Sequence, residues 1–407
     1  QNRNSISWGV LVSGYARHGC IDFSLYLIEC MNKEGMILDK ATFLCILKAC
    51  GREKTIAHGM LIHSRMVSIG FEFDHFLVNS LVDMYAKCKL MEEALYVFEN
   101  ASEKDVVCWV ALISGYIQLK KDKYSIELFK EMQQKGVSPD RVSFLCVLKA
   151  CGNLGMVIEG HIIHGCIVKY GFDINTDIQN TLIHVYSKCG FREEAYLVFD
   201  QSRNRDVVSW SAMAAGYVEE GSSSHALELF HAFQKEAIDP NTFLFSSVLT
   251  ACGSLRALHQ GRLIHGYIII NGHESDVVVA NSLIDMYGKC GSLNDSCHVF
   301  CNLSTPDEVS YGSLIAGSVQ NEQEDLVLDL FQKMQMQSIK PNQAIFALML
   351  KAYGIVGSFE QGGFIYAQII ENGFECDAVV VSSLIDMYVK CGSLEDARSV
   401  FEGMEER

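Results

Sequence analysis

The sequence has no apolar run of the length that crosses a bilayer. A transmembrane helix needs roughly 18 or more consecutive apolar residues, and no segment of the 407-residue chain approaches that length. No basic leader followed by a short apolar core opens the chain at Gln1. We therefore expect a soluble protein. Because the chain begins without Met and ends at Arg407 inside a repeated unit, a targeting segment or an appended domain can have been cut away.

Basic residues are scarce as well. The chain has 33 Lys and Arg against 49 Asp and Glu, which gives a net charge of −16. This balance argues against a protein that holds nucleic acid by bulk electrostatics. The 16 cysteines contain no CxxC pair, and many recur in register, as at Cys88, Cys189, Cys290 and Cys391. We interpret them as reduced, small apolar residues rather than as a disulfide framework or a metal site.

What the chain does contain is a long internal repeat. The stretch NSLIDMYGKCGSLNDSCHVF, which begins at Asn281, has close copies that begin at Asn79, Asn180 and Ser382. Successive copies are 101 residues apart, and the same offset joins Trp8, Trp109, Trp210 and Tyr311. A repeat that continues to both ends indicates one elongated array rather than two or three separate domains.

Each 101-residue period divides into three related units of 35, 35 and 31 residues. We place units 1 to 12 at 5–39, 40–74, 75–105, 106–140, 141–175, 176–206, 207–241, 242–276, 277–307, 308–342, 343–377 and 378–407, the last being truncated. The four periods are therefore 5–105, 106–206, 207–307 and 308–407, within a single array over residues 1–407.

Apolar residues within a unit follow helical spacing in two segments. In unit 5, VSFLCVLKAC is interrupted by GNLG and then MVIEGHIIHGCIVKYG resumes the pattern. One such helical hairpin cannot bury its apolar stripe alone, so neighbouring units must stack. The sequence thus predicts an all-α solenoid with an inner row of first helices and an outer row of second helices.

The three unit types resemble the P, L and S repeats of plant-type pentatricopeptide repeat proteins. The resemblance rests on VVSWSAMAAGYVEEGSSSHALELF, FSSVLTACGSLRALHQGRLIHGYIIINGHESD and NSLIDMYGKCGSLNDSCHVF, and it covers residues 5–407. It implies a right-handed superhelical solenoid and a mitochondrial or chloroplast protein that binds single-stranded RNA and selects cytidines for C-to-U editing. The tetratricopeptide repeat has a 34-residue period and lacks this alternation of lengths.

The resemblance also implies which residues read bases. In this family the fifth and the last residue of a unit recognise one base, and an Asn–Asp combination favours uracil. An amide offers both a donor and an acceptor to a pyrimidine edge, and a carboxylate can orient it. The candidate reading residues are Asn79 with Asp105, Asn180 with Asp206, Asn281 with Asp307, Ser211 with Asn241 for adenine, Ser246 with Asp276 for guanine, and Ser382 in the truncated unit. The alternative for the Asn–Asp pairs is a helix cap or turn.

With the N-terminus toward the RNA 5′ end, these residues predict the base pattern ??U??UAGU???. The second residue of each unit is expected to clamp the base, as an apolar face can sandwich a splayed base. The candidate clamps are Phe76, Val107, Val208, Phe243, Val278, Val309 and Val379. Apolar residues in the first turn of a helix are often core residues, which is the alternative.

The net charge argues less strongly against RNA binding when the charges of the predicted inner helices are counted separately. Positions 2–13 of the twelve units carry nine basic and five acidic residues, so the inner row has a charge of +4. Lys87, Lys188, Lys289 and Lys390 occupy one position in every third unit and are candidate phosphate contacts. A solvated lysine that complements a helix C-terminus is the alternative.

We expect no catalysis in this chain. His63, His164 and His265 lie three units apart, which at roughly 10 Å per packed helix layer separates them by some 30 Å. The zinc deaminases need an H-x-E and a P-C-x-x-C element, and neither occurs. We expect no cofactor and no metal, so an editing role would require a deaminase domain in trans and accessory editing proteins. A factor for organelle RNA stability, splicing or processing, and a scaffold for proteins, remain alternatives.

Overall fold

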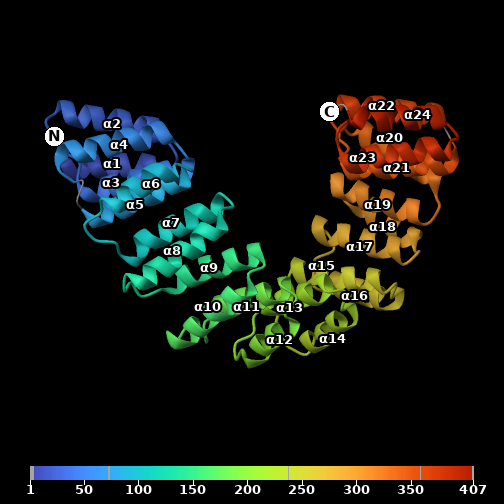
Figure 1. Cartoon of the computed structure of the whole chain (residues 1–407), viewed down its shortest axis with the longest axis horizontal. Helices are drawn as coiled ribbons and strands as arrows, with labels where there is room; N and C mark the ends of the chain where they lie inside the picture. Colours follow the sequence, from blue (N-terminus) through green and yellow to red (C-terminus); the bar gives the residue numbers. More distant parts are fainter. Residues whose placement is uncertain (1–3, 72–73, 237, 358, 406–407) are drawn as a thin grey trace. The chain divides into compact units, whose positions relative to one another are not determined.

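The computed structural model describes residues 4–71, 74–236, 238–357 and 359–405, and these residues form 24 α-helices and no β-strand. The chain divides into two compact halves, Gln1–Asn204 and Arg205–Arg407, each of which is described by itself. Figure 1 shows the helices stacked in chain order within each half. The predicted all-α fold of stacked helical repeats is confirmed.

The N-terminal half contains twelve helices in the described residues. They are α1 (Ser5–Arg17), α2 (Ile21–Lys33), α3 (Lys40–Glu53), α4 (Ile56–Ile69), α5 (His75–Lys87), α6 (Met91–Glu99), α7 (Val106–Gln118), α8 (Asp122–Gln134), α9 (Arg141–Leu154), α10 (Val157–Lys169), α11 (Thr176–Lys188) and α12 (Arg192–Gln201).

The C-terminal half contains another twelve in the part of it that the structure describes. They are α13 (Val207–Glu219), α14 (Ser223–Phe233), α15 (Thr242–Ser254), α16 (Leu258–Ile270), α17 (Val277–Lys289), α18 (Leu293–Asn302), α19 (Glu308–Gln320), α20 (Glu324–Met336), α21 (Gln343–Val356), α22 (Phe359–Glu371), α23 (Ala378–Lys390) and α24 (Leu394–Glu405). Each consecutive pair of helices lies within one predicted repeat unit, whereas the grouping of units into four triplets of one array stays a prediction.

The helices of each half form two layers. Consecutive odd-numbered helices pack directly on one another, from α1 to α11 in one half and from α13 to α23 in the other. Each even-numbered helix packs on the odd-numbered helix before it and, where another helix follows in the same half, on that helix as well. Among the described residues, consecutive even-numbered helices have no comparable contact. The odd-numbered helices are therefore the tightly packed row, and we call them the inner row.

The inner helices begin at a side-chain cap. The residue before each of the twelve is Asp or Asn, and its side-chain oxygen accepts a backbone N–H from the first turn. A cap of this kind satisfies a helix N–H that has no partner within the helix. From Asp39 onward, the cap is the last residue of a repeat unit, so one short side chain sets where each inner helix begins.

Large apolar side chains of the inner row fill the space between the layers. Phe43, Phe144, Phe245 and Phe346 recur every 101 residues and are completely buried. The series that begins with Trp109 is also buried, and each member packs edge-on against an aromatic ring: Trp109 on Phe98, Trp210 on Phe233 and Tyr311 on Phe300. Periodic apolar positions in the sequence are thus core positions.

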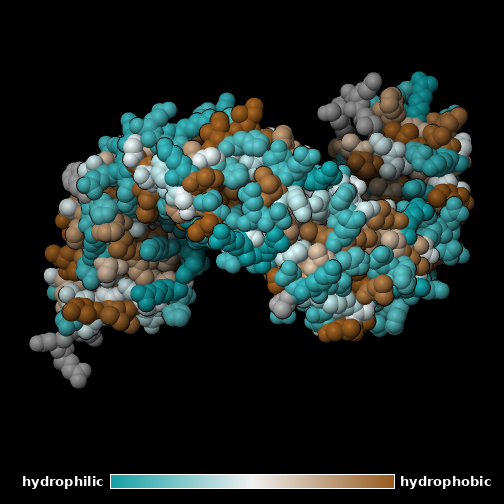
Figure 2. All heavy atoms as spheres, turned by 90° about the horizontal axis from the view of Figure 1, so that it is seen from below, coloured by the Kyte–Doolittle hydropathy of each residue, from teal (hydrophilic) through white to brown (hydrophobic). Residues whose placement is uncertain are grey.

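Some apolar side chains remain at the surface. Figure 2 shows brown patches separated by teal residues over the face that it presents. Among the described residues, no helix combines the length and the hydropathy needed to span a membrane.

Candidate nucleic-acid interface

The first predicted reading pair forms a direct hydrogen-bonded contact in the N-terminal half. Asn79 lies on α5, and its side-chain Nδ2 donates to Oδ1 and Oδ2 of Asp105 at 3.0 and 2.9 Å. Asp105 Oδ1 also accepts the backbone N–H of Cys108 at 3.0 Å and so caps α7. The reading role and the capping role proposed as alternatives thus use the same carboxylate.

The corresponding pair in the C-terminal half, Asn281 and Asp307, forms the same contact, and Ser310 adds a further one. Asn281 on α17 donates through Nδ2 to Asp307 Oδ1 at 3.2 Å, and Asp307 caps α19 by accepting the N–H of Ser310 at 2.8 Å. The Ser310 hydroxyl lies 2.6 Å from Asn281 Oδ1. Desolvation raises the pKa of Asp307, but hydrogen bonds from the N–H and hydroxyl of Ser310 and from Asn281 outweigh it, so the pKa is lowered. Asp307 is therefore a carboxylate at neutral pH, able only to accept.

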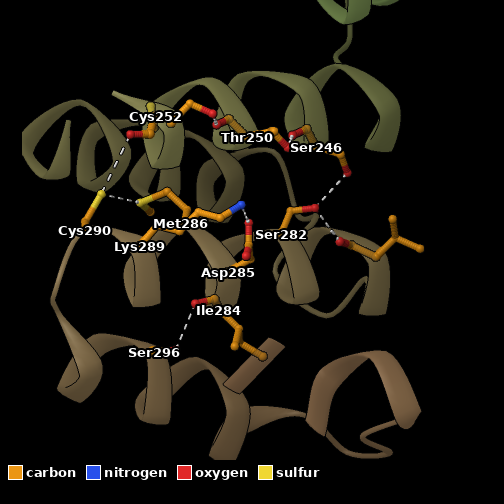
Figure 3. A network of polar contacts seen from close by, with 12 residues as sticks. Ser246, Thr250, Cys252, Ser282, Ile284, Asp285, Met286, Lys289, Cys290 and Ser296 are labelled. Atoms are coloured by element: carbon orange, nitrogen blue, oxygen red, sulfur yellow. Dashed lines mark hydrogen bonds and ion pairs between the residues drawn. The ribbon is translucent and has the colours of Figure 1, made fainter. Parts of the chain in front are cut away.

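The two serine pairs differ from each other. Ser211 on α13 donates its hydroxyl to Asn241 Oδ1 at 2.9 Å or to the Val207 carbonyl at 2.6 Å. Ser246 on α15 shares no hydrogen bond with Asp276 in the part of the chain that the structure describes. As Figure 3 shows, Ser246 instead faces Ser282 of α17, with 3.1 Å between the two hydroxyl oxygens. The assignment of Ser246 and Asp276 as a base-reading pair stays a prediction.

The remaining predicted reading residues, Asn180, Asp206 and Ser382, are located one by one rather than as pairs. Asn180 is buried on α11 of the N-terminal half, whereas Asp206 belongs to the C-terminal half and caps α13 through the N–H of Ser209 at 2.9 Å. Ser382 is exposed on α23 and donates to the Ala378 carbonyl at 2.7 Å.

The predicted base clamps are surface residues rather than core residues. Each lies in the first turn of an inner helix with between 49% and 74% of its surface exposed: Phe76, Val107, Val208, Phe243, Val278, Val309 and Val379. The Phe76 ring also contacts the His75 ring, with 3.8 Å between the centroids, and the Lys40 ammonium, which lies 4.2 Å from its centroid. The core alternative is therefore wrong for these seven residues, whereas their role as base clamps stays a prediction.

Three of the four predicted phosphate contacts are ion-paired within their own helix. Lys87 pairs with Asp83 at 2.6 Å, Lys289 with Asp285 at 2.7 Å and Lys390 with Asp386 at 2.6 Å. The corresponding position four residues before Lys188 is His184, and Lys188 has no ion-pair partner among the described residues. A pair at i and i+4 lowers the charge that each lysine offers to a phosphate. The Asp–Lys spacing was visible in the sequence and could have predicted this difference.

The paired lysines also have a packing role. The stem of Lys289 lies over α15, where a Cβ on Gly253 would be 3.1 Å from Lys289 Cδ. Lys87 lies in the same way over Gly51, and Lys390 over Gly354. These lysines therefore cover the inner-row contact with their aliphatic stems.

The recurring histidines join neighbouring units. Nδ1 of His63, His164 and His265 lies 2.8, 2.9 and 2.9 Å from the hydroxyl of Tyr85, Tyr186 and Tyr287 respectively. Burial lowers the pKa of each histidine and raises that of each tyrosine to about 12. Each pair joins the second unit of a 101-residue period to the third by a neutral hydrogen bond.

The buried cysteines are poor nucleophiles. Burial raises the pKa of Cys151 and of Cys252 to about 12, so both are neutral thiols at pH 7. The ranges that the structure describes hold no group of three His, Cys, Asp or Glu side chains that could bind a metal ion. The polar groups of the inner row are instead suited to recognising a hydrogen-bonding edge.

Family models match most of the chain. The PPR repeat model matches residues 6–36, 76–106, 180–207, 208–238, 278–304 and 379–407. The PPR repeat family model matches 104–153, and the pentatricopeptide repeat domain model matches 305–355.

Similar proteins carry the same repeat. A pentatricopeptide repeat-containing protein of Arabidopsis thaliana is 30% identical over 99% of this chain and 60% of its own length. A mitochondrial one is 33% identical over 98% and 58%, and a chloroplastic one is 32% identical over 99% and 46%. The chain thus spans about half to three fifths of the length of these relatives.

A solved structure has the same fold. The pentatricopeptide repeat protein PPR10, in complex with an 18-nucleotide psaJ RNA element, matches 100% of this chain and 69% of its own chain, with a TM-score of 0.66 and 16% identity. With the repeat models on most of its length, this chain belongs to the pentatricopeptide repeat family.

Proposed function

We propose that this chain binds single-stranded RNA in a plant organelle and recognises its base sequence. The observation that carries the proposal is the pair of contacts Asn79–Asp105 and Asn281–Asp307, each beside an exposed apolar residue at the start of the same unit. In unit 3 that residue is Phe76, and in unit 9 it is Val278. One unit therefore offers an apolar face for stacking and an oriented amide for hydrogen bonding, which are the two components of single-stranded RNA recognition.

The orientation of the amide supports uracil as the preferred base of units 3 and 9. A carboxylate can only accept, so the asparagine must present Nδ2 to it, and its amide cannot flip without placing oxygen against oxygen. An amide fixed in this way has one donor–acceptor pattern. Uracil offers an N3–H donor next to carbonyl acceptors, whereas cytosine offers an acceptor at N3, so the two pyrimidines are distinguishable.

The similar proteins support the RNA partner and the compartment. PPR10 was crystallised with RNA, and two of the matching relatives are named mitochondrial and chloroplastic. We propose by analogy that the protein acts in one of these organelles.

Selection of bound sequences from a random single-stranded RNA pool tests the proposal. We expect uracil at every third base in the pattern ??U??UAGU???. The Asn180→Ser variant should shift the preference at the sixth base toward guanine, with the other bases unchanged. A folded chain that enriches no sequence would contradict RNA recognition and favour a protein scaffold.

We further propose that the RNA-bound protein directs C-to-U editing. Support comes from the recurrence of three unit types in the order 35, 35 and 31 residues, which resembles the editing subclass of the family. Catalysis would come from a deaminase domain in trans or from a part of the protein outside these residues. Loss of the gene should then abolish conversion of particular cytidines in organelle transcripts. Altered transcript ends or unspliced introns, with editing intact, would instead indicate a processing or splicing factor.

Accessory editing proteins are the second proposed partner. The second helices of the L-type units, α4, α10, α16 and α22, each expose apolar side chains at two recurring positions. One series is Leu61, Ile162, Leu263 and Phe364, and the other is Val67, Val168, Ile269 and Ile370. Exposed apolar residues at a fixed register suit a protein partner that repeats along the array. Replacing both members on α16 by Ser should weaken such binding and leave RNA binding by the chain alone unchanged.

A further inference from the structure

The third residue of a repeat unit lies beside the fifth residue of the unit before it. In the C-terminal half, the Ser310 hydroxyl of unit 10 lies 2.6 Å from Asn281 Oδ1 of unit 9. A Cβ on Gly312 of unit 10 would lie 3.6 Å from Ile345 Cγ1 of unit 11. In the N-terminal half, a Cβ on Gly9 of unit 1 would lie 2.8 Å from Thr42 Oγ1 of unit 2. In these three places the neighbour occupies the same position of the following unit, although the residue there differs.

In unit 9 this neighbour holds the reading amide at its second end. Asp307 accepts from Asn281 Nδ2, while the Ser310 hydroxyl points at Asn281 Oδ1. Ser310 Oγ also accepts the Asp307 N–H at 3.1 Å and lies 2.8 Å from Asp307 Oδ1. Its single hydrogen can be donated to only one oxygen at a time, and Asn281 Oδ1 is the nearer of the two acceptors. The Ser310 side chain is completely buried. Asp307 therefore holds the amide of Asn281 against a flip, and the Ser310 hydroxyl opposes a tilt while it donates to Asn281 Oδ1.

In unit 3 the residue at the corresponding position of the next unit is a cysteine, which cannot hold the amide of Asn79 in the same way. Cys108 is the third residue of unit 4 and is completely buried beside Asp105. Burial raises the pKa of its thiol to about 12, and a neutral thiol is only a weak donor. Asn79 Oδ1 is buried and accepts no hydrogen bond, although Asp105 holds the other end of its amide.

A buried acceptor without a partner is unfavourable, so the amide of Asn79 gains by tilting toward water. Asp105 opposes a flip of the amide but leaves this tilt free. Two units with the same Asn–Asp pair thus differ in how firmly the amide is held before RNA binds.

We propose that the third residue of the following unit is a positioning residue for base recognition: Ser310 sharpens the preference of unit 9 for uracil, and Cys108 leaves unit 3 more tolerant. The inference rests on the proposed RNA recognition by these pairs and adds a determinant outside the fifth and last positions. An amide with a fixed orientation discriminates between the N3–H donor of uracil and the N3 acceptor of cytosine. An amide that can tilt is able to hydrogen-bond to either base.

Exchange of the two residues tests the proposal. The whole 407-residue chain and its Cys108→Ser and Ser310→Ala variants would be titrated with single-stranded RNA of the pattern ??U??UAGU???, with adenine at the undetermined bases. Each protein is measured with uracil and with cytosine at the third base, and separately at the ninth. One hydrogen bond to a polar group is worth roughly a 2- to 10-fold change in affinity.

We expect Cys108→Ser to raise the ratio of uracil to cytosine affinity at the third base by about 2- to 10-fold. Ser310→Ala should lower the ratio at the ninth base by a similar factor, and neither variant should change the ratio at the other base. Because serine occupies the third position in unit 10, it fits the site that Cys108 occupies in unit 4.

Ser143→Ala is the matched control. Ser143 is the third residue of unit 5 and forms the same capping box, with Asp140 N–H donating to Ser143 Oγ at 2.8 Å. The fifth residue of unit 4 is Val110, so there is no reading amide beside it. Ser143→Ala should lower the unfolding midpoint as Ser310→Ala does, but leave both base ratios unchanged.

The outcomes separate this inference from the proposed function. A parent chain that prefers uracil at the third and ninth bases, with ratios unchanged in both variants, would overturn the inference and leave RNA recognition intact. A parent chain with no preference at either base would overturn RNA recognition by these pairs, and the inference with it. A change in the unfolding midpoint alone would assign Ser310 a capping role only.

Discussion

The carboxylate of Asp105 holds the side-chain amide of Asn79 at 2.9 and 3.0 Å, across two neighbouring inner helices. The same carboxylate caps α7. The proposed recognition and the initiation of α7 therefore depend on one side chain, and we expect a substitution there to change both.

Asp105→Ala should lower the free energy of unfolding by about 1 kcal/mol for the lost cap and by about 1 kcal/mol for the unpaired amide of Asn79. It should also remove the uracil preference at the third base, because the amide is no longer oriented. Urea unfolding and RNA titration measure the two effects. Asp39→Ala is the control, since Asp39 caps α3 but the fifth residue of its unit is Gly9. An equal loss of base preference in both variants would contradict a specific role for Asp105.

Lys188→Ala should reduce the salt dependence of RNA binding more than Lys87→Ala does. Each phosphate contact adds about 0.7 to the slope of log affinity against log salt concentration for a single strand. Lys87 already pairs with Asp83 at 2.6 Å, whereas Lys188 has His184 at that position. Binding measured between 50 and 300 mM salt gives the slopes, with roughly 0.7 expected for Lys188. Equal slopes for the two variants would show that the ion pair does not weaken a phosphate contact.

Gly288→Ala should destabilise the C-terminal half. A Cβ at Gly288 on α17 would lie 2.9 Å from Gly317 Cα on α19, which is backbone and cannot move aside. Overpacking of this kind costs about 1–3 kcal/mol. Gly266→Ala on α16 meets nothing within 4 Å and should instead stabilise by roughly 0.5–1 kcal/mol through helix propensity. Thermal unfolding of both variants would show opposite signs, and a stabilising Gly288→Ala would refute the close approach.

Acidification should lower stability through His63, His164 and His265. Burial lowers the pKa of each in the folded chain, so the unfolded chain binds protons first as the pH falls. Stability is therefore complete above the unfolded pKa of about 6.5 and decreases as the pH falls below it. Each unit of pKa depression is worth about 1.4 kcal/mol per histidine.

Urea midpoints at pH 7.5 and pH 5.5 measure this pH effect. A variant with Gln at all three positions should lose the part of the pH dependence that these histidines supply. Should it keep the full pH dependence, other groups are responsible for it.

The repeat and the helices were predictable from the sequence alone. The 101-residue period, the apolar spacing and the Asp or Asn at the end of each unit are local features, and helix capping and amphipathicity depend on residues close together in the chain. The aromatic series at Trp109 and the phenylalanines at Phe43 and Phe144 likewise follow from the requirement that stacked hairpins bury their apolar stripes.

Counting along the sequence located the reading positions but not their contacts. It could not show that Phe76 and Val278 are exposed while Phe43 and Trp109 are buried, because the sequence does not say which side of an apolar helix its neighbour covers. Nor could it show that the hydroxyl of Ser246 lies against that of Ser282 on the next inner helix.

The length, type and start of each helix were thus determined by the sequence, since these depend on interactions within a few residues. The tertiary structure decided which amide has a second hydrogen bond and which does not. Asn79 and Asn281 are the same residue at the same position, but Asn281 Oδ1 meets the Ser310 hydroxyl, whereas Asn79 Oδ1 is buried without a hydrogen bond.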